Sequence, residues 1–322
     1  MSYVVTVTPS PAIDVSTSVA RIAPFTKLRC ASPQHDPGGG GINVARVVKR
    51  LGGVVTAIYP AGGTTGQRLR RLIKLERVPD LAITAMEETR EDFTVFEETT
   101  SRQYRFVFPG ARLSEPEWRQ CLRALANVQP SPNFVVASGS LPLGVPDDFF
   151  GGVVRAAREM NAKTIVDTSG PPLRAALQEG VYLIKPNLRE FQELTGVSSS
   201  DHLALVEASR RLIDKGLVEL IALTLGADGA LLIARDRALR ADGLPIKPAS
   251  VVGAGDSFVG AMTWSLAAGD SLDRAFRFGV AAGSAALLNP GTELCRSEDV
   301  QRLAAQVVVR PISGTDDAAR ID

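Results

Sequence analysis

Short runs of β-branched and apolar residues alternate along this chain with segments whose apolar positions recur at helical spacing. This alternation is typical of an α/β fold, in which helices cover a mostly parallel sheet. A glycine follows the helical patterns that end at Leu51, Lys215 and Ala268, and glycine is a common stop signal. We expect strands at 3–8, 134–137, 164–167, 182–184 and 220–224, and helices at 42–51, 147–161, 204–215 and 256–268.

Residues 92–108 break the alternation with two β-rich runs around a turn-like Thr99-Thr100-Ser101-Arg102, which predicts a hairpin. We expect the hairpin to join extended segments in a small sheet outside the main one, made from parts of 15–36 and 90–108. Such an appendage either covers a ligand site or pairs with a second copy of the chain through its edges. The polar residues from Pro311 onward are expected to be frayed.

Composition restricts the classes of function. The 322 residues, 45% of them hydrophobic, can bury the core of one large domain, 1–322. A net charge of +1 gives no reason to expect nucleic acid or a membrane as a partner. No apolar run or leader suggests insertion or secretion, and three scattered cysteines favour a reducing, cytoplasmic location. His35 and His202 are the only histidines, so a histidine-rich metal site or a Ser-His-Asp triad fits poorly.

The stretch Gly253-Ala254-Gly255-Asp256 stands where an apolar run stops and a helical pattern begins. Glycines allow close approach of a ligand, and the free N–H groups of a first helical turn attract an anion. Asp256 would repel a phosphate there, yet a carboxylate is suited to act as a base that faces a hydroxyl nucleophile. Aspartate is also a favoured N-cap, so a purely structural role for Asp256 stays open.

A second glycine-rich stretch, Gly38 to Gly41, leads directly into another predicted helix. Four consecutive glycines are costly in conformational entropy, which favours close backbone approach to a ligand over an ordinary flexible loop. Asn43 follows and can donate to and accept from sugar hydroxyls. Asp14 lies just beyond the first predicted strand, where ligands of open α/β sheets bind, although it could serve only in a turn.

Other predicted strand ends carry similar loops, at Ser138-Gly139-Ser140, Lys185-Pro186-Asn187 and Thr224-Leu225-Gly226. Glu190 follows the second of these and either complements a helix dipole or binds Mg²⁺ through water. Together these loops predict a ligand site along the carboxyl edge of the sheet. Basic side chains near the small sheet could hold a sugar phosphate, and the candidates are Lys27, Arg29, Arg90, Arg102 and Arg105, of which the first three are favoured.

The two glycine motifs, in this order and with Lys185-Pro186-Asn187-Leu188-Arg189-Glu190 between them, resemble the ribokinase-like PfkB family of carbohydrate kinases from Val4 to about Leu303. The similarity is greatest to the phosphosugar branch that uses fructose 6-phosphate. It implies a ribokinase-like, mostly parallel sheet flanked by helices, with the small sheet as a lid and two interlocked lids in a homodimer. The matching segments of that branch are Ser10–Asp14, Lys27–Cys30, Gln103–Phe106 and Val280–Ala286.

The resemblance implies transfer of a phosphoryl group from ATP to the C1 hydroxyl of fructose 6-phosphate, giving fructose 1,6-bisphosphate. Asp256 would be the general base, beside an anion-binding turn formed by Gly253, Ala254 and Gly255. The implied sugar-phosphate ligands are Asp14, Lys27, Arg29, Gly38, Gly39, Asn43, Arg90, Ser138 and Gly139. The implied nucleotide-site residues are Lys185, Asn187, Thr224, Gly226, Gly229 and Ser284.

Two metal ions are also implied by the resemblance. Glu190 would organise Mg²⁺, through water. A K⁺ site built largely from backbone carbonyls would fall on Ser250, Val252, Ala286, Asn289 and Gly291. This chain departs from the family pattern beside that site, because Glu293 stands where the family has a basic residue and Pro290 is also unusual.

Several alternatives remain. 1-Phosphofructokinase and tagatose-6-phosphate kinase often carry a lysine in the first glycine run, and the glycine at position 40 favours fructose 6-phosphate instead. A dinucleotide dehydrogenase fits poorly, because Phe258 stands where the third glycine of GxGxxG belongs. A sugar-phosphate-binding regulator without turnover would share the fold, but the presence of Asp256 and Glu190 favours an enzyme.

Overall fold

The computed structural model describes residues 2–312 and contains a ten-stranded sheet in the order β14-β13-β12-β11-β10-β9-β8-β1-β4-β5. Strands from β11 to β5 run parallel, and β12, β13 and β14 are added antiparallel at one edge. The predicted α/β class is therefore confirmed. The strands are β1 (Tyr3–Val7), β4 (Val54–Gly62), β5 (Asp80–Ala85), β8 (Phe134–Ser138), β9 (Lys163–Asp167), β10 (Val181–Ile184), β11 (Val218–Thr224), β12 (Ala230–Ile233), β13 (Ala238–Ala241) and β14 (Val309–Pro311).

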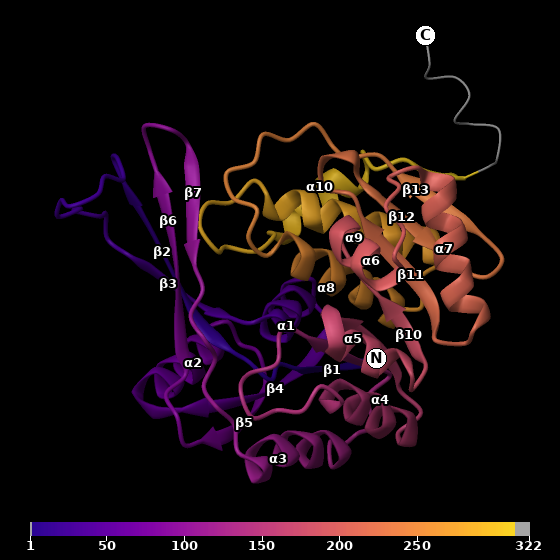
Figure 1. Ribbon diagram of the computed structural model, residues 1–322, viewed down its shortest axis with the longest axis horizontal. Helices are drawn as coiled ribbons and strands as arrows, with labels where there is room; N and C mark the ends of the chain where they lie inside the picture. Colours follow the sequence, from indigo (N-terminus) through magenta and orange to yellow (C-terminus); the bar gives the residue numbers. More distant parts are fainter. Residues whose placement is uncertain (1, 313–322) are drawn as a thin grey trace.

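Helices cover both faces of this sheet (Figure 1). Successive side chains of a strand point to opposite faces, so Val4 packs in one core and Val5 in the other. The first core includes residues of α1 (Gly40–Arg50), α2 (Gly63–Leu75), α8 (Ala254–Ala267), α9 (Leu272–Ala286) and α10 (Ser297–Ala304). The second includes residues of α3 (Glu115–Ala126), α4 (Phe149–Glu159), α5 (Gly170–Leu177), α6 (Leu188–Thr195) and α7 (His202–Asp214).

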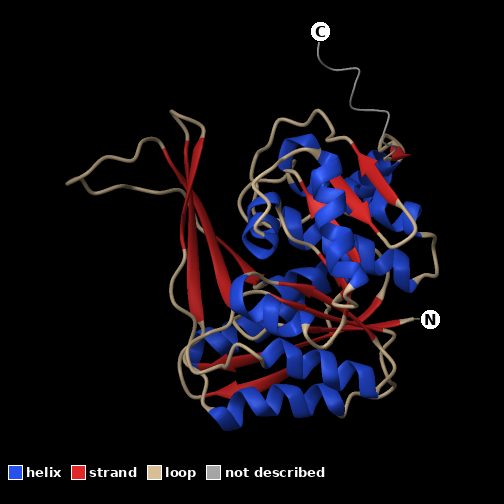
Figure 2. Ribbon diagram, turned by 45° about the vertical axis from the view of Figure 1, so that its right-hand side comes forward, coloured by secondary structure: helices blue, strands red, loops and turns tan. Residues whose placement is uncertain are grey.

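A separate four-stranded sheet, here called the lid sheet, has the order β3-β2-β6-β7. Its strands are β2 (Ala12–Val19), β3 (Gln34–Gly38), β6 (Arg90–Glu97) and β7 (Arg102–Phe106). The long strands on the left of Figure 2 extend away from the main body, while at their base β2 and β3 contact α2, and β3 also contacts α1. The antiparallel β6–β7 pair confirms the predicted hairpin, and β2 and β3 supply the predicted extended segments.

The predicted helices and strands are all present, with bounds that differ by at most two residues. One prediction is wrong at its first residues: Pro311 belongs to β14 and pairs with Leu239, and the Ile312 N–H donates to the carbonyl of Ala238. Backbone pairing with β13 therefore orders these two residues. The rest of the segment expected to be frayed lies outside the described residues. Within 2–312, the helices are all too short or too polar to cross a membrane.

Helices α1 and α8 cross closely because Gly260 lies at their contact. A Cβ atom on Gly260 would lie 2.7 Å from the Val47 Cβ and 3.2 Å from the Val44 carbonyl oxygen. Since α1 carries Asn43 and α8 carries Asp256, this close crossing brings together two residues that the sequence separates by 213 positions.

We expect Gly260→Ala to lower the free energy of unfolding by ~1–3 kcal/mol, because overpacking forces the helices apart. Gly151→Ala in α4 is the matched control: the nearest atom to its Cβ would be the Glu179 Cγ, at 3.4 Å. That control should be neutral or stabilising by ~0.4–1 kcal/mol, through reduced freedom of the unfolded chain. Urea unfolding followed by circular dichroism measures both, and equal effects of the two substitutions would contradict the close crossing.

Candidate active site

The first turn of α8 lies at the centre of the candidate site. The helix begins at Ala254, and Gly253 is its N-cap with a φ of 76°, in the left-handed region that glycine tolerates. The interpretation of Asp256 as an N-cap is therefore wrong, because the helix starts two residues earlier and Asp256 belongs to its first turn. Gly253 offers no side chain to the first-turn N–H groups, so that turn can receive an anion.

Asp256 is partly buried, and Asn43 Nδ2 donates a hydrogen bond of 2.9 Å to its Oδ2 atom. Burial raises the pKa of Asp256 to about 6, and nearby Asp167 raises it as well, whereas Asn43 and Lys185 lower it. A carboxyl group with this pKa is mostly ionised at neutral pH, yet it is a stronger base than an ordinary aspartate. The electrostatics thus suit a general base.

Lys185, which follows β10, is buried beside the same turn. Its Nζ atom lies 3.3 Å from Asp167 Oδ1, and a Cβ on Gly255 would lie 3.3 Å from that Nζ. Burial lowers the pKa of Lys185, but Asp167 and then Glu190 raise it, and the net pKa lies above its usual value. A fixed cation therefore stands next to the N–H groups that could face a phosphoryl group.

Sequence reasoning missed Asp167 as a site residue. It is the last residue of β9, and the Gly139 N–H donates to its carbonyl oxygen at 3.0 Å. The available signal was the same one that identified Asp14, a carboxylate at the carboxyl end of a predicted parallel strand.

The first glycine run lies against Asp14 and Ser138. A Cβ on Gly38 would lie 2.3 Å from Asp14 Oδ2, and a Cβ on Gly40 would lie 2.2 Å from Ser138 Oγ. Gly39 is the N-cap of α1 with a φ of 107°. Only glycine permits these approaches without rearrangement, which favours the close-approach interpretation over a flexible loop.

Asp14 itself is 4% exposed. Burial raises its pKa to about 6, Arg105 lowers it and Asp92 raises it. A buried carboxylate of this kind can accept hydrogen bonds from hydroxyl groups of a ligand. The structure therefore brings Asp14, the glycine run and Ser138 to one place, at the ends of β1 and β8.

The predicted basic residues divide into two groups. Arg90 begins β6, where Nη1 donates to the Phe108 carbonyl at 2.7 Å and Nη2 lies 3.6 Å from Asp92 Oδ2. The Nε of Arg90 is buried and has no hydrogen-bond partner among the described residues. Lys27 and Arg29, in contrast, lie exposed on the segment between β2 and β3, and the structure does not bring them into the buried cluster.

The predicted nucleotide residues occupy neighbouring strand ends. Asn187 and Glu190 form a capping box on α6, in which the Glu190 Oε2 accepts from the Asn187 N–H at 2.9 Å. Thr224 pairs with Asn187 at the end of β11. Glu190 therefore caps α6 through Oε2, while its Oε1 atom is free of the capping box and can bind Mg²⁺ through water. Within 2–312, no group of three or more His, Cys, Asp or Glu side chains is arranged to hold a metal ion.

The remaining nucleotide residues are two glycines and Ser284. Gly226 and Gly229 have φ values of 65° and 97°, in the turn between β11 and β12. A Cβ on Gly229 would lie 2.1 Å from the Ala241 carbonyl oxygen, so a structural requirement already explains this glycine. Ser284 lies on α9 next to Gly283, whose Cβ would lie 3.3 Å from the Ala254 carbonyl oxygen, so this part of α9 adjoins the first turn of α8.

The segments predicted to bind K⁺ lie side by side. Ser250 Oγ donates to the Gly291 carbonyl oxygen at 2.6 Å, and the Ala249 N–H donates to the Leu287 carbonyl oxygen at 2.7 Å. Val252, Ala286 and Asn289 belong to the same two segments. The carboxylate of Glu293 pairs with Arg296 Nε at 2.9 Å, so its charge is locally balanced. Gln103 of the lid sheet donates to Ser250 Oγ at 3.1 Å, which joins the lid sheet to this region.

Comparison with known proteins places these features in context. The family model for pfkB family carbohydrate kinases matches residues 2–299. The chain is 45% identical to ATP-dependent 6-phosphofructokinase isozyme 2 of Mycobacterium tuberculosis, over 93% of this chain and 88% of the relative. Similarity to a 1-phosphofructokinase from Xanthomonas campestris is lower, at 31% identity over 95% of this chain and 97% of that relative.

Solved structures give the same picture. Phosphofructokinase-2 from Escherichia coli in complex with potassium superimposes with a TM-score of 0.90 at 42% identity, covering 95% of this chain and 99% of the other. The same enzyme in complex with fructose-6-phosphate gives a TM-score of 0.89 at 41% identity, with the same coverage.

The raised pKa of Asp256 predicts a substitution that stabilises the fold. The folded protein holds this proton more tightly than the unfolded chain, so stability is lost as the pH rises from about 4 through about 6. Asp256→Asn removes that charge and should raise the free energy of unfolding at pH 7 by up to about 3 kcal/mol.

Thermal unfolding of the parent and of Asp256→Asn at pH 7 and pH 4 measures the effect. The difference in Tm should be largest at pH 7 and small at pH 4, where the carboxyl group is protonated in the folded parent and only partly ionised in its unfolded chain. An Asp256→Asn variant that is less stable than the parent at pH 7 would contradict the raised pKa.

Proposed function

Because the chain belongs to the pfkB family of carbohydrate kinases, we propose that it transfers the γ-phosphoryl group of ATP to the C1 hydroxyl of fructose 6-phosphate. The products are fructose 1,6-bisphosphate and ADP. The observation that carries this proposal is the position of the Asp256 carboxylate, bound to Asn43 beside the glycine run and next to the free first turn of α8. We treat the whole chain, 1–322, as one kinase domain with a lid.

Asp256 acts as the general base in this proposal. Its Oδ2 is held by Asn43, and Oδ1 faces the C1 hydroxyl, whose proton passes to the carboxylate as the oxygen attacks phosphorus. Phosphoryl transfer has a loose transition state, so orientation of the hydroxyl matters more than its full prior deprotonation. A pKa of about 6 suits that task, because the base is ionised in the resting enzyme.

The backbone N–H groups of Ala254, Gly255 and Asp256 stabilise the negative charge that develops on the transferred group. Gly253 provides the left-handed turn that leaves these groups free. Lys185 adds a fixed positive charge beside them, held in place by Asp167. The backbone and Lys185 therefore bind the phosphoryl group, while the Asp256 carboxylate faces the sugar, and the two roles do not conflict.

Fructose 6-phosphate is proposed to lie between the glycine run and the lid sheet. Asp14 and Asn43 bind its hydroxyls, and Gly38, Gly39, Ser138 and Gly139 allow close backbone approach. Arg90, the first residue of β6, supplies positive charge for the phosphate. Lys27 and Arg29 would reach this phosphate only if their exposed segment moved towards the site. The greater similarity to 6-phosphofructokinase than to 1-phosphofructokinase supports this sugar.

ATP is proposed to lie over Asn187, Thr224, Gly226, Gly229 and Ser284. Mg²⁺ fits such a site as a partner of the nucleotide, because it usually takes one or two carboxylates together with phosphates and water, and the Glu190 Oε1 atom is not engaged by the capping box. Glu190 would hold the ion through water, and the ion would supply positive charge beside the nucleotide phosphates. K⁺ is proposed at the carbonyl oxygens of Ser250, Val252, Ala286, Asn289 and Gly291, where the Arg296 pair balances Glu293.

The lid sheet is proposed to close the site and to join two copies of the chain. Phe106, Val107 and Phe108 are 51%, 56% and 50% exposed on or just after β7, an apolar surface that a second lid could cover. Closure would exclude water from the phosphoryl group and limit hydrolysis of ATP.

The three cysteines are free, which supports a reducing, cytoplasmic location.

A coupled assay with ATP and Mg²⁺ tests the substrate. We expect kcat/KM for fructose 6-phosphate to exceed that for fructose 1-phosphate and for tagatose 6-phosphate by ~10-fold or more, since one misplaced group costs about 1–3 kcal/mol. EDTA should abolish turnover of every sugar. Preference for fructose 1-phosphate would contradict the proposed substrate, and binding of all three sugars without turnover would indicate a regulator.

A further inference from the structure

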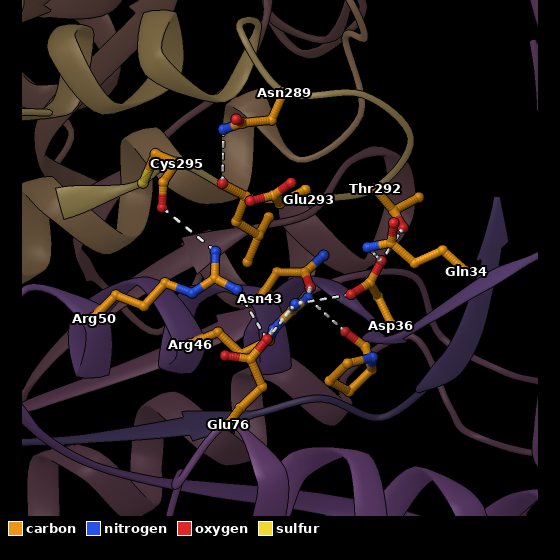
Figure 3. A network of polar contacts seen from close by, with 12 residues as sticks. Gln34, Asp36, Asn43, Arg46, Arg50, Glu76, Asn289, Thr292, Glu293 and Cys295 are labelled. Atoms are coloured by element: carbon orange, nitrogen blue, oxygen red, sulfur yellow. Dashed lines mark hydrogen bonds and ion pairs between the residues drawn. The ribbon is translucent and has the colours of Figure 1, made fainter. Parts of the chain in front are cut away.

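Arg46 of α1 is 1% exposed, and its guanidinium donates to four different residues (Figure 3). One of these is Asn43 on the same helix, whose Oδ1 lies 3.2 Å from Arg46 Nη1. Nη1 also donates to the Pro37 carbonyl oxygen at 2.9 Å. The remaining N–H groups face the carboxylates of Asp36 and Glu76.

Arginine donates hydrogen bonds but cannot accept them. The Asn43 atom that faces Arg46 must therefore be the amide oxygen, and the NH₂ group must face Asp256. A carboxylate accepts and cannot donate when ionised, so the Asn43–Asp256 bond of 2.9 Å requires the same orientation. Two independent neighbours thus select one of the two orientations of the Asn43 amide.

Resting on the proposed function, we propose that Arg46 is a positioning residue for phosphoryl transfer. It holds the Asn43 amide so that NH₂ binds Asp256 Oδ2, and Asp256 Oδ1 is left to take the proton of the sugar hydroxyl. Without that bond the amide can rotate and set its oxygen against the carboxylate, which leaves two acceptors facing each other and moves the base.

The buried guanidinium is itself held firmly. Glu76 Oε1 accepts from Nη2 at 2.6 Å and from Nε at 3.1 Å, while Asp36 Oδ1 lies 3.4 Å from Nη2. Burial raises the pKa of Glu76, but Arg46 and Arg50 lower it below the usual value, so the carboxylate stays ionised at neutral pH. A guanidinium group held by several fixed partners can in turn fix the orientation of the neighbouring Asn43 amide.

The same network reaches two other parts of the molecule. Asp36 belongs to β3 of the lid sheet, and its Oδ2 accepts from Thr292 Oγ1 at 2.9 Å. Thr292 follows Gly291 in the segment that is proposed to bind K⁺. Arg46 therefore connects Asn43 to one strand of the lid sheet and to that segment (Figure 3). Asn43 in turn binds the base, Asp256.

Arg46→Lys tests the inference, because lysine keeps the buried charge but lacks the fork that reaches Asn43 and both carboxylates. We expect kcat for fructose 6-phosphate to fall ~100-fold, as for a misplaced catalytic group, with KM for ATP little changed. Arg50→Lys is the matched control: Arg50 also pairs with Glu76, at 2.8 Å, but has no bond to Asn43, so kcat should stay close to that of the parent.

A double-mutant cycle separates positioning from a general structural role. If Arg46 acts through Asn43, adding Arg46→Lys to Asn43→Ala should lower kcat little further. Losses that multiply in the double variant would overturn the inference, and so would an Arg46→Lys enzyme with the kcat of the parent. Circular dichroism checks that each variant is folded.

Glu76→Gln provides a second variant in case Arg46→Lys does not fold, because it loosens Arg46 without removing it. It should lower kcat in the same direction, and an unchanged kcat would overturn the inference. A parent enzyme that phosphorylates none of the sugars would overturn the proposed function and this inference together. An active parent with equally active variants would overturn the inference alone.

Discussion

The close crossing of α1 and α8 is the constraint on which the site depends. Gly260 lets the helices approach, and their first turns then meet at the carboxyl edge of the sheet, where Asn43 binds Asp256. The N-caps of both helices are glycines, Gly39 and Gly253, with φ values that other residues rarely adopt. Two backbone turns that can approach a ligand are thus placed on either side of one carboxylate.

Charge is concentrated at this crossing to a degree that is unfavourable for stability. Asp256, Asp14 and Asp167 all have raised pKa values, with burial as the first cause in each. Lys185 compensates in part by pairing with Asp167. Such an arrangement is expected where a base must be strong and a phosphoryl group must be bound within a few ångströms of it.

The sequence alone predicted the α/β class, the hairpin and most of the candidate site, because hydrophobic periodicity and strand-end loops are local signals. It missed several elements, among them β4, β5, β12 and β13. β4 contains Pro60 and ends at Gly62, and both residues usually argue against a strand. The network of Arg46 was beyond local reasoning, since its partners Asp36 and Glu76 come from separate segments. Lys27 and Arg29 were favoured from their position in the sequence, but they lie on an exposed segment.

The central claim is that Asp256 performs chemistry and is dispensable for binding. Calorimetric titration of Asp256→Asn with fructose 6-phosphate and with a nonhydrolysable ATP analogue, combined with single-turnover transfer from ATP, tests it most directly. The account predicts dissociation constants close to those of the parent and a transfer rate lower by ~10²–10⁴-fold, the usual contribution of a general base. Transfer at the rate of the parent, or loss of sugar binding as the cause of inactivity, would contradict it.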